Sequence, residues 1–351
     1  MKIHILYKFR EGPWGGGNQF LKALRDYLKK HDLYEEDFDK ADAVLFSGFP
    51  FQTEYYFKKL FRFKRKNPSK LVIYRRDGPI SLIRGKDEVL DKILTLFSSI
   101  VADGIIFQTE WSRGKNQKLF GMKSQNEAVI FNAPDNTIFN RKGKAPRKEK
   151  IKLIATSWSS HWRKGFKVYQ YLDEHLDFSK YEMTFVGNSP VEFKNIIHKE
   201  PVDSKKLASI IKEHDLFITA SKTDPCSNSL IEALSCGLPA VVYNDGGHPE
   251  LVGKGGEVFN DNEEALKKIE LVAKNYKDYQ ANLSAFKFER AGKEYVDFIK
   301  GIFDSAEKNE YNTKQMTLDR KIKFAYMKAR VLAWKLKGIL EFLMKKVQGK
   351  V

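Results

Sequence analysis

Two carboxylates, Asp224 and Glu232, stand on either side of a run of small polar residues, just after the apolar run DLFITA that is typical of a buried strand. Ser227, Asn228 and Ser229 fall where the next helix should begin, so their amides and hydroxyls could bind an anionic group such as a diphosphate. Glu232 would lie one turn into that helix, where a carboxylate can accept hydrogen bonds from ribose hydroxyls. Asp224 precedes the helix and could accept hydrogen bonds from the hydroxyls of a sugar.

A basic segment, HWRKG, follows the apolar run IKLIATSW and should lie at the carboxyl edge of the same sheet. When a bond to a diphosphate breaks, the leaving group gains negative charge, and a fixed cation stabilises it without a metal ion. Lys164 is the candidate for this role, and Arg163 could share or replace it. A solvated basic loop is the alternative. His161 and Trp162 are more typical of packing, and we assign them no catalytic task.

Three glycines, Gly15 to Gly17, stand between the apolar run IHILY and a helical pattern. Glycine lets the backbone approach a ligand closely, and the following helix presents its N-terminal amides to an anion. We therefore expect Gly16 and Gly17 beside the diphosphate. The spacing differs from the dinucleotide fingerprint, and the lysine of a P-loop is absent, which disfavours both of those sites. A flexible turn is the alternative.

Short apolar runs alternate with helical periodicity along most of the chain, which predicts parallel sheets with helices on both faces and ligands beyond the carboxyl ends of the strands. The charged segment 141–150 interrupts the pattern and predicts a linker. We therefore expect an α/β fold of two doubly wound, Rossmann-like domains facing a cleft, residues 1–145 and 150–303, and a basic helical tail, residues 304–351. The predicted strands are IHILY, AVLFS, LVIYR, GIIFQ and AVIFN before the linker, and IKLIATSW, YEMTFVG, DLFITA, AVVYN and GEVF after it.

The segment from Asp215 to Gly253 resembles the donor site of the retaining glycosyltransferases of family 4, which have the two-domain GT-B fold. That family has two acidic residues separated by seven others. Asp224 and Glu232 match this pair, with aspartate in place of the usual first glutamate, and the stretches ALSCGLP and GGHPE also match closely. The resemblance implies hexosyl transfer with retention, from a nucleotide diphosphate sugar to a glycan or lipid-linked acceptor, as in the synthesis of cell-surface polysaccharide or lipopolysaccharide.

The same resemblance implies roles for single residues. Lys164 corresponds to the cation that binds the donor phosphates. Asp77 follows the run LVIYR, where family members keep a polar residue beside the reacting sugar, although a turn-forming Asp-Gly is the alternative. With Asp224 and Glu232 they make up the expected catalytic set. The first domain would bind the acceptor and the second the sugar nucleotide, with neither a metal ion nor a cofactor.

Polar residues at the ends of two strands of the first domain are candidates for the acceptor side. Arg75 and Arg76 end one strand and could meet an acceptor phosphate, or could instead pair with surface acids. Gln108 and Glu110 stand at the end of the next strand and could line the same side. Glu110 could instead simply cap its helix.

The composition limits which binding partners and which cellular compartment fit the protein. The formal net charge of +17 implies an anionic partner, which could be nucleic acid, a membrane surface or a phosphorylated substrate. The two cysteines, Cys226 and Cys236, suit a reducing compartment, and no apolar run is long enough for a membrane span or a signal-peptide core. We therefore expect a cytoplasmic protein that is peripheral on the inner face of the cytoplasmic membrane.

The tail holds about half of the excess charge, with eleven basic and two acidic residues from Tyr311 to Val351. Residues 321–347 carry apolar side chains at helical spacing among lysines and arginines, which is typical of a helix lying on an anionic membrane surface. Packing on the first domain or on a dimer partner is the alternative. The expected apolar stripe is Phe324, Met327, Val331 and Trp334, then Leu336, Ile339 or Leu340, Leu343 and Val347.

Other functions fit parts of the sequence. A nucleic-acid-binding protein would suit the charge, but the core holds no reader motif and the basic excess lies in an amphipathic tail, so we expect no nucleic-acid partner. A nucleotide-sugar epimerase or a non-catalytic sugar-nucleotide binder could use the same donor site. Asp37 and Asp39 have the spacing that metal-dependent glycosyltransferases of another fold use for a cation. They precede a strand at its amino edge, and we interpret them as a solvated turn.

Overall fold

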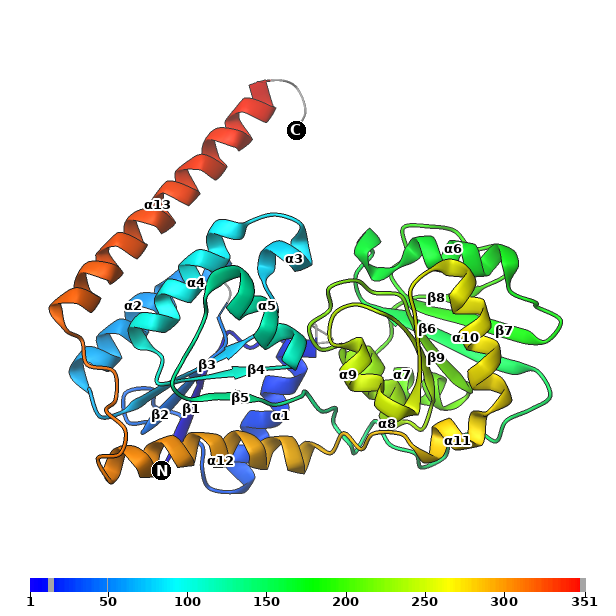
Figure 1. Cartoon of the computed structure of the whole chain (residues 1–351), viewed down its shortest axis with the longest axis horizontal. Helices are drawn as coiled ribbons and strands as arrows, with labels where there is room; N and C mark the ends of the chain where they lie inside the picture. The colour runs from blue at the N-terminus through cyan, green and yellow to red at the C-terminus, as the bar shows by residue number, and fades with distance from the viewer. Residues whose placement is uncertain (12–15, 49, 348–351) are drawn as a thin grey trace.

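The computed structural model describes residues 1–11, 16–48 and 50–347. They form two α/β domains, each built on a parallel sheet, and a long C-terminal helix that rises away from the first domain (Figure 1). This is the fold class expected from the sequence. Of the three glycines after the first strand, Gly15 lies outside the described residues.

The first sheet has five parallel strands in the order β1-β2-β3-β4-β5. Helices α1 and α12 cover one face, and α2 and α4 cover the other, which explains why the strands are nearly continuous apolar runs. The strands are β1 (Ile3–Leu6), β2 (Ala43–Phe46), β3 (Leu71–Arg76), β4 (Gly104–Phe107) and β5 (Glu127–Val129). The helices are α1 (Gly16–Lys30), α2 (Pro50–Lys66), α3 (Ile80–Arg84), α4 (Glu88–Val101), α5 (Glu110–Phe120) and α12 (Phe288–Glu307).

The order in which the chain adds segments to the first sheet reverses at β1. After α1 the chain lies beside β1 at Tyr34, where Ile3 donates to Leu33 O (2.7 Å) and accepts from Glu35 N (2.9 Å). In a parallel pair these groups point to one side of β1, and those of Lys2 and His4 point to the other, where β2 lies. The carboxyl end of β1, where the glycine loop begins, is therefore the switch point at which open α/β sheets bind ligands.

The second sheet has six parallel strands in the order β11-β10-β9-β6-β7-β8, so its switch point lies between β6 and β9. Helices α6 and α10 cover one face and α7 and α8 the other. The strands are β6 (Ile151–Ser157), β7 (Tyr181–Gly187), β8 (Ile197–Lys199), β9 (Leu216–Thr219), β10 (Ala240–Tyr243) and β11 (Gly256–Phe259). The helices are η1 (Trp162–Lys164), α6 (Phe166–His175), α7 (Ser204–Lys212), α8 (Asn228–Ser235), α9 (His248–Val252), η2 (Gly253–Gly255), α10 (Asn262–Lys274) and α11 (Tyr276–Ala281).

One strand and several short helices are absent from the sequence prediction. Strand β8 lies at the edge of the second sheet with all three residues exposed, so it has no apolar run to reveal it. Helices α3, α9 and α11 have five or six residues, which is too short for a recognisable helical period.

Helix α12 returns the chain to the first domain, although its residues up to 303 are assigned to the second domain on sequence. Tyr295, Ile299 and Ile302 are buried in the core that includes α1. The rings of Phe20 and Tyr295 have centroids 5.5 Å apart. The helix lies along the underside of the first domain in Figure 1.

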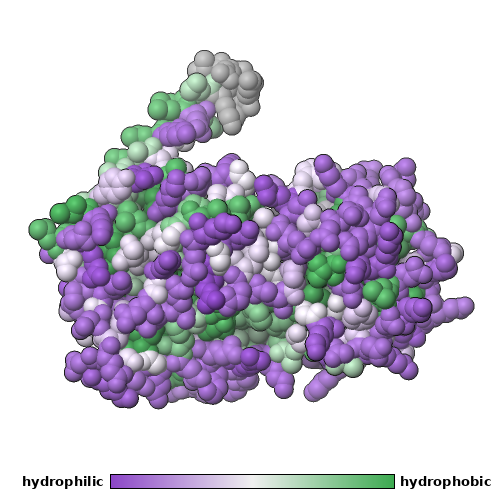
Figure 2. Space-filling model, viewed as in Figure 1, coloured by the Kyte–Doolittle hydropathy of each residue, from purple (hydrophilic) through white to green (hydrophobic). Residues whose placement is uncertain are grey.

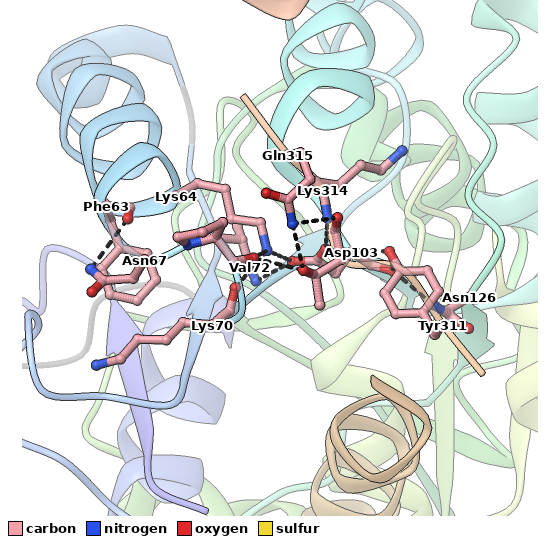
Figure 3. A network of polar contacts seen from close by, with 12 residues as sticks. Phe63, Lys64, Asn67, Lys70, Val72, Asp103, Asn126, Tyr311, Lys314 and Gln315 are labelled. Carbon is pink, nitrogen blue, oxygen red and sulfur yellow. Dashed lines mark hydrogen bonds and ion pairs between the residues drawn. The ribbon is translucent and has the colours of Figure 1, made fainter. Parts of the chain in front are cut away.

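A buried polar network fastens the segment between α12 and the C-terminal helix to the first sheet (Figure 3). Asp103 Oδ2 accepts hydrogen bonds from Lys64 Nζ (2.8 Å) and Val72 N (2.9 Å). Its Oδ1 accepts from Lys314 N (2.7 Å) and the Tyr311 hydroxyl (3.3 Å). Both side chains of the Lys64–Asp103 ion pair are fully buried, so losing either partner would leave an uncompensated charge in the interior. The start of the C-terminal helix is thereby held in place.

Helix α13 (Leu318–Val347) has two apolar faces where the sequence predicts one stripe. Phe324 and Met327 are buried on α2 and α4, with Phe324 stacked on Phe61 at 4.0 Å, and Val331 and Trp334 pack against the same core. The second half of the predicted stripe is exposed, and Val347 is described only in its backbone. No helix in the described ranges is long and apolar enough to span a membrane.

Candidate functional site

Helix α8 begins where the sequence predicts a diphosphate site. Ser227 is the N-cap, and its Oγ accepts a hydrogen bond from Leu230 N (3.5 Å). Asn228 and Ser229 open the helix, and Glu232 lies one turn in, as predicted. The first amides of a helix have no intrahelical acceptor and carry its positive dipole end, which favours an anion here.

The N-terminus of α1 approaches α8 across the cleft. A Cβ on Gly16 would overlap the side-chain amide of Asn228, so only glycine allows this approach. Asn132 Nδ2 also donates to Asn228 Oδ1 (3.1 Å). Gly17, in contrast, borders open space. Two helix N-termini, one from each domain, therefore meet at the same place.

A cavity of about 420 Å³ lies beside these two helix ends and has the size of a small-molecule site. It contains Lys164, Asp224 and Glu232, the three second-domain residues expected to act on a donor. Its other lining residues are Gly16, Gln19, Thr156, Ser157, Trp158, Ser159, Tyr169, Val186, Gly187, Pro201, Val202, Ser204, Leu207, Thr219, Ser221, Cys226, Ser227, Asn228 and Ser229. We call this space the donor cavity.

Lys164 and Asp224 form an ion pair in the donor cavity, with Nζ and Oδ2 3.0 Å apart. They follow β6 and β9, the two strands that flank the switch point of the second sheet. Burial opposes ionisation of Asp224, but the Lys164 ammonium and a backbone amide outweigh burial and lower the pKa of this carboxyl. Asp224 is therefore a carboxylate at neutral pH and can accept hydrogen bonds from sugar hydroxyls.

The glycine pair of GGHPE holds the backbone of Asp224 in place. Gly246 has φ of +68°, and a Cβ there would overlap Asp224 O. Gly247 N donates to the same carbonyl (2.9 Å). His248 is fully buried, and burial lowers its pKa. This histidine therefore packs beneath the site as a neutral ring.

Glu232 lines the donor cavity without a cation to balance it. Burial raises its pKa to about 8, so this carboxyl is largely protonated at neutral pH. It also lines a larger cavity of about 650 Å³ between α1, residues 133–139 and the start of α12. That cavity lacks Lys164 and Asp224, so we place donor chemistry in the smaller one.

Asp77 lies on the opposite wall of the cleft, in the first domain. Its Oδ1 accepts hydrogen bonds from Arg75 Nη1 (3.0 Å) and from Gln108 Nε2, while the side chain stays 55% exposed. Gly78, the next residue, packs against Pro225, the residue after Asp224. The structure therefore brings Asp77 near the donor site, with Gln108 and Arg75 holding its carboxylate.

Two of the residues expected on the acceptor side are buried, and their side chains are paired within the protein. Arg76 is buried and donates to Asp91 Oδ1 (2.5 Å) and Asn116 Oδ1 (2.9 Å), so it points into the protein. Arg75 is also buried, and besides Asp77 it donates to Asn132 Oδ1 (2.8 Å). Apart from Asp77, their partners lie in the interior, where two buried guanidinium groups must be paired to offset the loss of hydration.

A basic cavity of about 480 Å³ meets the donor cavity at Ser159, Lys164 and Asp224. Both domains line it. Its cationic side chains are Arg84, Lys86, Arg163, Lys164 and Lys222, against the single carboxylate of Asp224, and the rest of its lining is Ile83, Ser159, His161, Thr223 and Pro225. Arg163, expected at the donor, donates to Leu82 O of the first domain (3.0 Å) and so lies on this side.

A carboxylate of the second domain caps a helix of the first. Glu250 Oε2 accepts from Glu110 N (2.8 Å) and Oε1 from Trp111 N (2.7 Å), at the N-terminus of α5. Thr109 Oγ1 also donates to Pro225 O (2.8 Å). The side chain of Glu110 pairs with Arg113 at 2.6 Å, so its backbone, more than its carboxylate, takes part in the domain contact.

We expect Glu250→Ala to weaken the contact between the two domains by roughly 1–3 kcal/mol, because two charge-assisted hydrogen bonds are lost. Small-angle X-ray scattering should then give a larger radius of gyration than for the unaltered protein. Glu263→Ala, which changes an exposed glutamate on α10, is the control. Equal radii for the two variants would show that Glu250 does not hold the domains together.

The sequence did not predict the role of several residues of the site. Glu250 stands in a matched motif, GGHPE, but its role depends on α5, which lies about 140 residues away. Arg84 ends the five-residue helix α3 and Lys222 stands in a loop, and nothing in their local sequence marks them. Thr156 and Trp158 end a predicted strand and could be found by extending the rule that strand ends line the cleft. Across residues 1–11, 16–48 and 50–347, no three His, Cys, Asp or Glu side chains gather as metal ligands would.

Comparison with known proteins agrees with this geometry. Residues 167–289, which lie mostly in the second domain, match the family described as "Glycosyl transferases group 1". Two curated relatives are a probable sucrose-phosphate synthase of Thermosipho melanesiensis, 23% identical over 163 residues, and an uncharacterized 41.2 kDa protein in the cps region of Klebsiella pneumoniae, 26% identical over 134 residues. The matches span 43% and 36% of this chain, and 38% and 37% of those relatives.

Solved structures support the fold over most of the chain. Anabaena Alr3699/HepE, in complex with UDP and glucose, has a TM-score of 0.67 at 15% identity, and the match covers 86% of this chain and all of that one. Sucrose-phosphate synthase of Thermosynechococcus elongatus has a TM-score of 0.59 at 13% identity, with 85% and 83% covered. The architecture is therefore that of the two-domain GT-B-like proteins.

Proposed function

We propose that this protein is a retaining hexosyltransferase that moves a sugar from a nucleotide diphosphate to a glycan or lipid-linked acceptor without a metal ion. The observation that carries the proposal is the Lys164–Asp224 ion pair in the donor cavity, next to the meeting helix N-termini of α1 and α8. The match of residues 167–289 to a glycosyltransferase family supports it, and the UDP bound in a similar structure makes UDP-sugars the first donors to test.

Each residue has a task in the proposed reaction. The amides at Asn228 and Ser229 and the Lys164 ammonium bind the diphosphate, and Glu232 accepts hydrogen bonds from the ribose. The bond between the sugar C1 and the diphosphate oxygen breaks, and Lys164 stabilises the charge that the leaving group gains. The acceptor hydroxyl attacks C1 from the same face, and its proton passes to the leaving phosphate. Asp224 holds hydroxyls of the transferred sugar.

The first-domain carboxylate Asp77 completes the proposed site. It is held by Arg75 and Gln108, and its proposed role is to accept a hydrogen bond from the reacting sugar. Asp224 is one methylene shorter than the family's usual glutamate, which leaves room for a sugar of different shape. The proposal therefore includes an altered donor sugar preference.

A thermal-shift panel of nucleotide diphosphates and their sugars tests the donor site directly. We expect at least one to stabilise the protein, and Glu232→Ala to abolish that shift. The product should also form in the presence of a chelator. Its nuclear magnetic resonance spectrum should show the same anomeric configuration at C1 as the donor sugar. Inverted configuration, or free sugar nucleotide epimerised without an acceptor, would contradict the proposal.

The basic cavity supports an acceptor that carries phosphate, because five cations surround a space that meets the donor cavity at Lys164 and Asp224. A lipid-linked or phosphorylated glycan has this chemistry. The relative encoded in a cps region favours cell-surface polysaccharide synthesis, at the cytoplasmic face of the membrane.

We expect Arg84→Glu/Lys222→Glu to raise KM for a phosphorylated acceptor by roughly tenfold or more, since two cations become anions. KM for the donor should change little, because neither residue lines the donor cavity. Lys267→Glu/Lys274→Glu, which reverses two exposed lysines on α10, is the charge-matched control. An equal change in both KM values would argue against a phosphate-bearing acceptor in this cavity.

A further inference from the structure

The outward face of α13 is an unpaired apolar surface on the first domain. Leu336 follows Met327 by nine residues, and Leu340 follows Val331 by nine. At about 100° per residue, nine residues place a side chain on the opposite side of a helix. Met327 and Val331 pack on the domain, so this second row points away from it.

Large apolar side chains fill this outward row along the whole helix. Single exposed apolar residues are ordinary on a protein surface, but a continuous row marks an interaction site. Figure 2 shows green, hydrophobic atoms among purple, hydrophilic ones along the projecting part of α13. They are Leu318, Ile322, Tyr326, Leu332, Leu336, Ile339, Leu340, Leu343 and Met344, each at least 50% exposed.

Basic residues flank the outward row on both sides. Lys321, Lys328 and Lys335 recur every seven residues along one flank, and Lys323, Arg330 and Lys337 along the other. The two acids of the helix, Asp319 and Glu341, pair with Lys323 and Lys337 within it. The helix as a whole carries nine basic and two acidic residues, so the surface that it offers is both apolar and cationic.

We propose that the outward face of α13 docks on an anionic membrane surface, with its leucines and isoleucines among the acyl chains and its lysines at the headgroups. The charge favours this occupant over a second copy of the chain, because pairing two such helices would bring like charges together. The inference does not depend on the proposed sugar transfer.

The base of α13 is held firmly enough to fix the orientation of the docked protein. Lys64 and Asp103 fasten the segment that leads into the helix, and the Phe61–Phe324 stack seats its first turns. The helix is about 45 Å long, and its second half projects beyond the domain (Figure 1). Docking would therefore place α13 between the lipid and the first domain, the proposed acceptor side.

Co-sedimentation of the full chain with vesicles tests the docking. We expect at least about tenfold more binding to vesicles with about three parts phosphatidylglycerol to seven parts phosphatidylcholine than to phosphatidylcholine alone. Leu336→Glu/Leu343→Glu should remove that binding. The control is Leu119→Glu/Leu271→Glu, which adds the same charge at exposed leucines of α5 and α10.

Three results would overturn the inference: equal binding to both kinds of vesicle, binding that Leu336→Glu/Leu343→Glu leaves intact, or a dimer in sedimentation equilibrium that this variant dissociates while no vesicle is bound. Thermal unfolding of each variant shows that the fold is retained. If vesicle binding fails while sugar transfer persists, the proposed function stands and only the docking is rejected. If sugar transfer fails while vesicle binding persists, the docking stands and the proposed function is rejected.

Discussion

Lys164→Ala is expected to lower kcat by roughly two to three orders of magnitude, the loss seen when one preorganised group that stabilises transition-state charge is removed. The Lys164 ammonium lies 3.0 Å from Asp224, in the donor cavity and at its junction with the basic cavity. A leaving diphosphate bound at the start of α8 would gain charge next to it. The affinity for the intact donor should fall much less, because the negative charge grows during the reaction.

Single-turnover kinetics with saturating donor measure this effect without a contribution from product release. Lys164→Arg keeps the positive charge and should recover part of the rate. Recovery should be incomplete because the planar guanidinium differs in shape from the ammonium. Lys167→Ala, at an exposed position on α6, is the control. A Lys164→Ala protein whose kcat equals that of Lys167→Ala would remove the lysine from the proposed reaction.

The affinity for a sugar nucleotide should rise with pH, by up to about tenfold per unit between roughly pH 6 and pH 8, and level off above. Burial raises the pKa of Glu232 to about 8, so the free protein holds a proton there at neutral pH. Ribose hydroxyls donate hydrogen bonds and favour the ionised carboxylate, so binding must expel that proton. Isothermal titration calorimetry with UDP-glucose in two buffers of different ionisation enthalpy counts the protons released.

Glu232→Gln cannot ionise and should show neither the pH dependence nor the proton release. Its affinity should also be roughly 10- to 100-fold lower, because a charge-assisted acceptor is lost. An identical pH profile in the two proteins would assign the titration to another group.

The same carboxyl makes the free protein less stable in alkali. Its pKa is higher in the folded state than in the unfolded chain, so its contribution to stability is fully present below the unfolded pKa, near 4.5, and is lost as pH rises through about 8. Thermal unfolding should therefore show that the Tm of Glu232→Gln increases relative to the Tm of the unaltered protein as pH rises from 5 to 8.

Much of the fold and of the donor side is readable in the sequence. Buried parallel strands are short apolar runs, and a helix start has its own chemistry, so α8, its cap at Ser227 and Glu232 one turn in stand where the residues predict them. Their proposed roles in catalysis remain predictions until the variants are measured. Edge strand β8 and the three shortest helices leave no such signal, since exposed or very short segments need no apolar pattern.

The acceptor side could not be read in the same way. Arg75 and Arg76 stand side by side in sequence at a strand end, yet Asp91, Asn116 and Asn132 draw them inward. The cations of the basic cavity come from α3, η1 and loops of both domains. Both arginines are paired with residues that stand 15 to 57 positions further along the chain, and no local pattern records these partners.

The basic tail shows the same division most clearly. Its sequence determined that residues 318–347 form a cationic helix with apolar residues, because helical spacing and charge are local properties. Only the tertiary structure decided that Phe324 and Met327 face the domain while Leu336 and Leu343 face outward. The reason is physical: both rows are equally apolar, and the choice between them was made by the surface that α2 and α4 offer and by the Asp103 network that fixes how the helix begins.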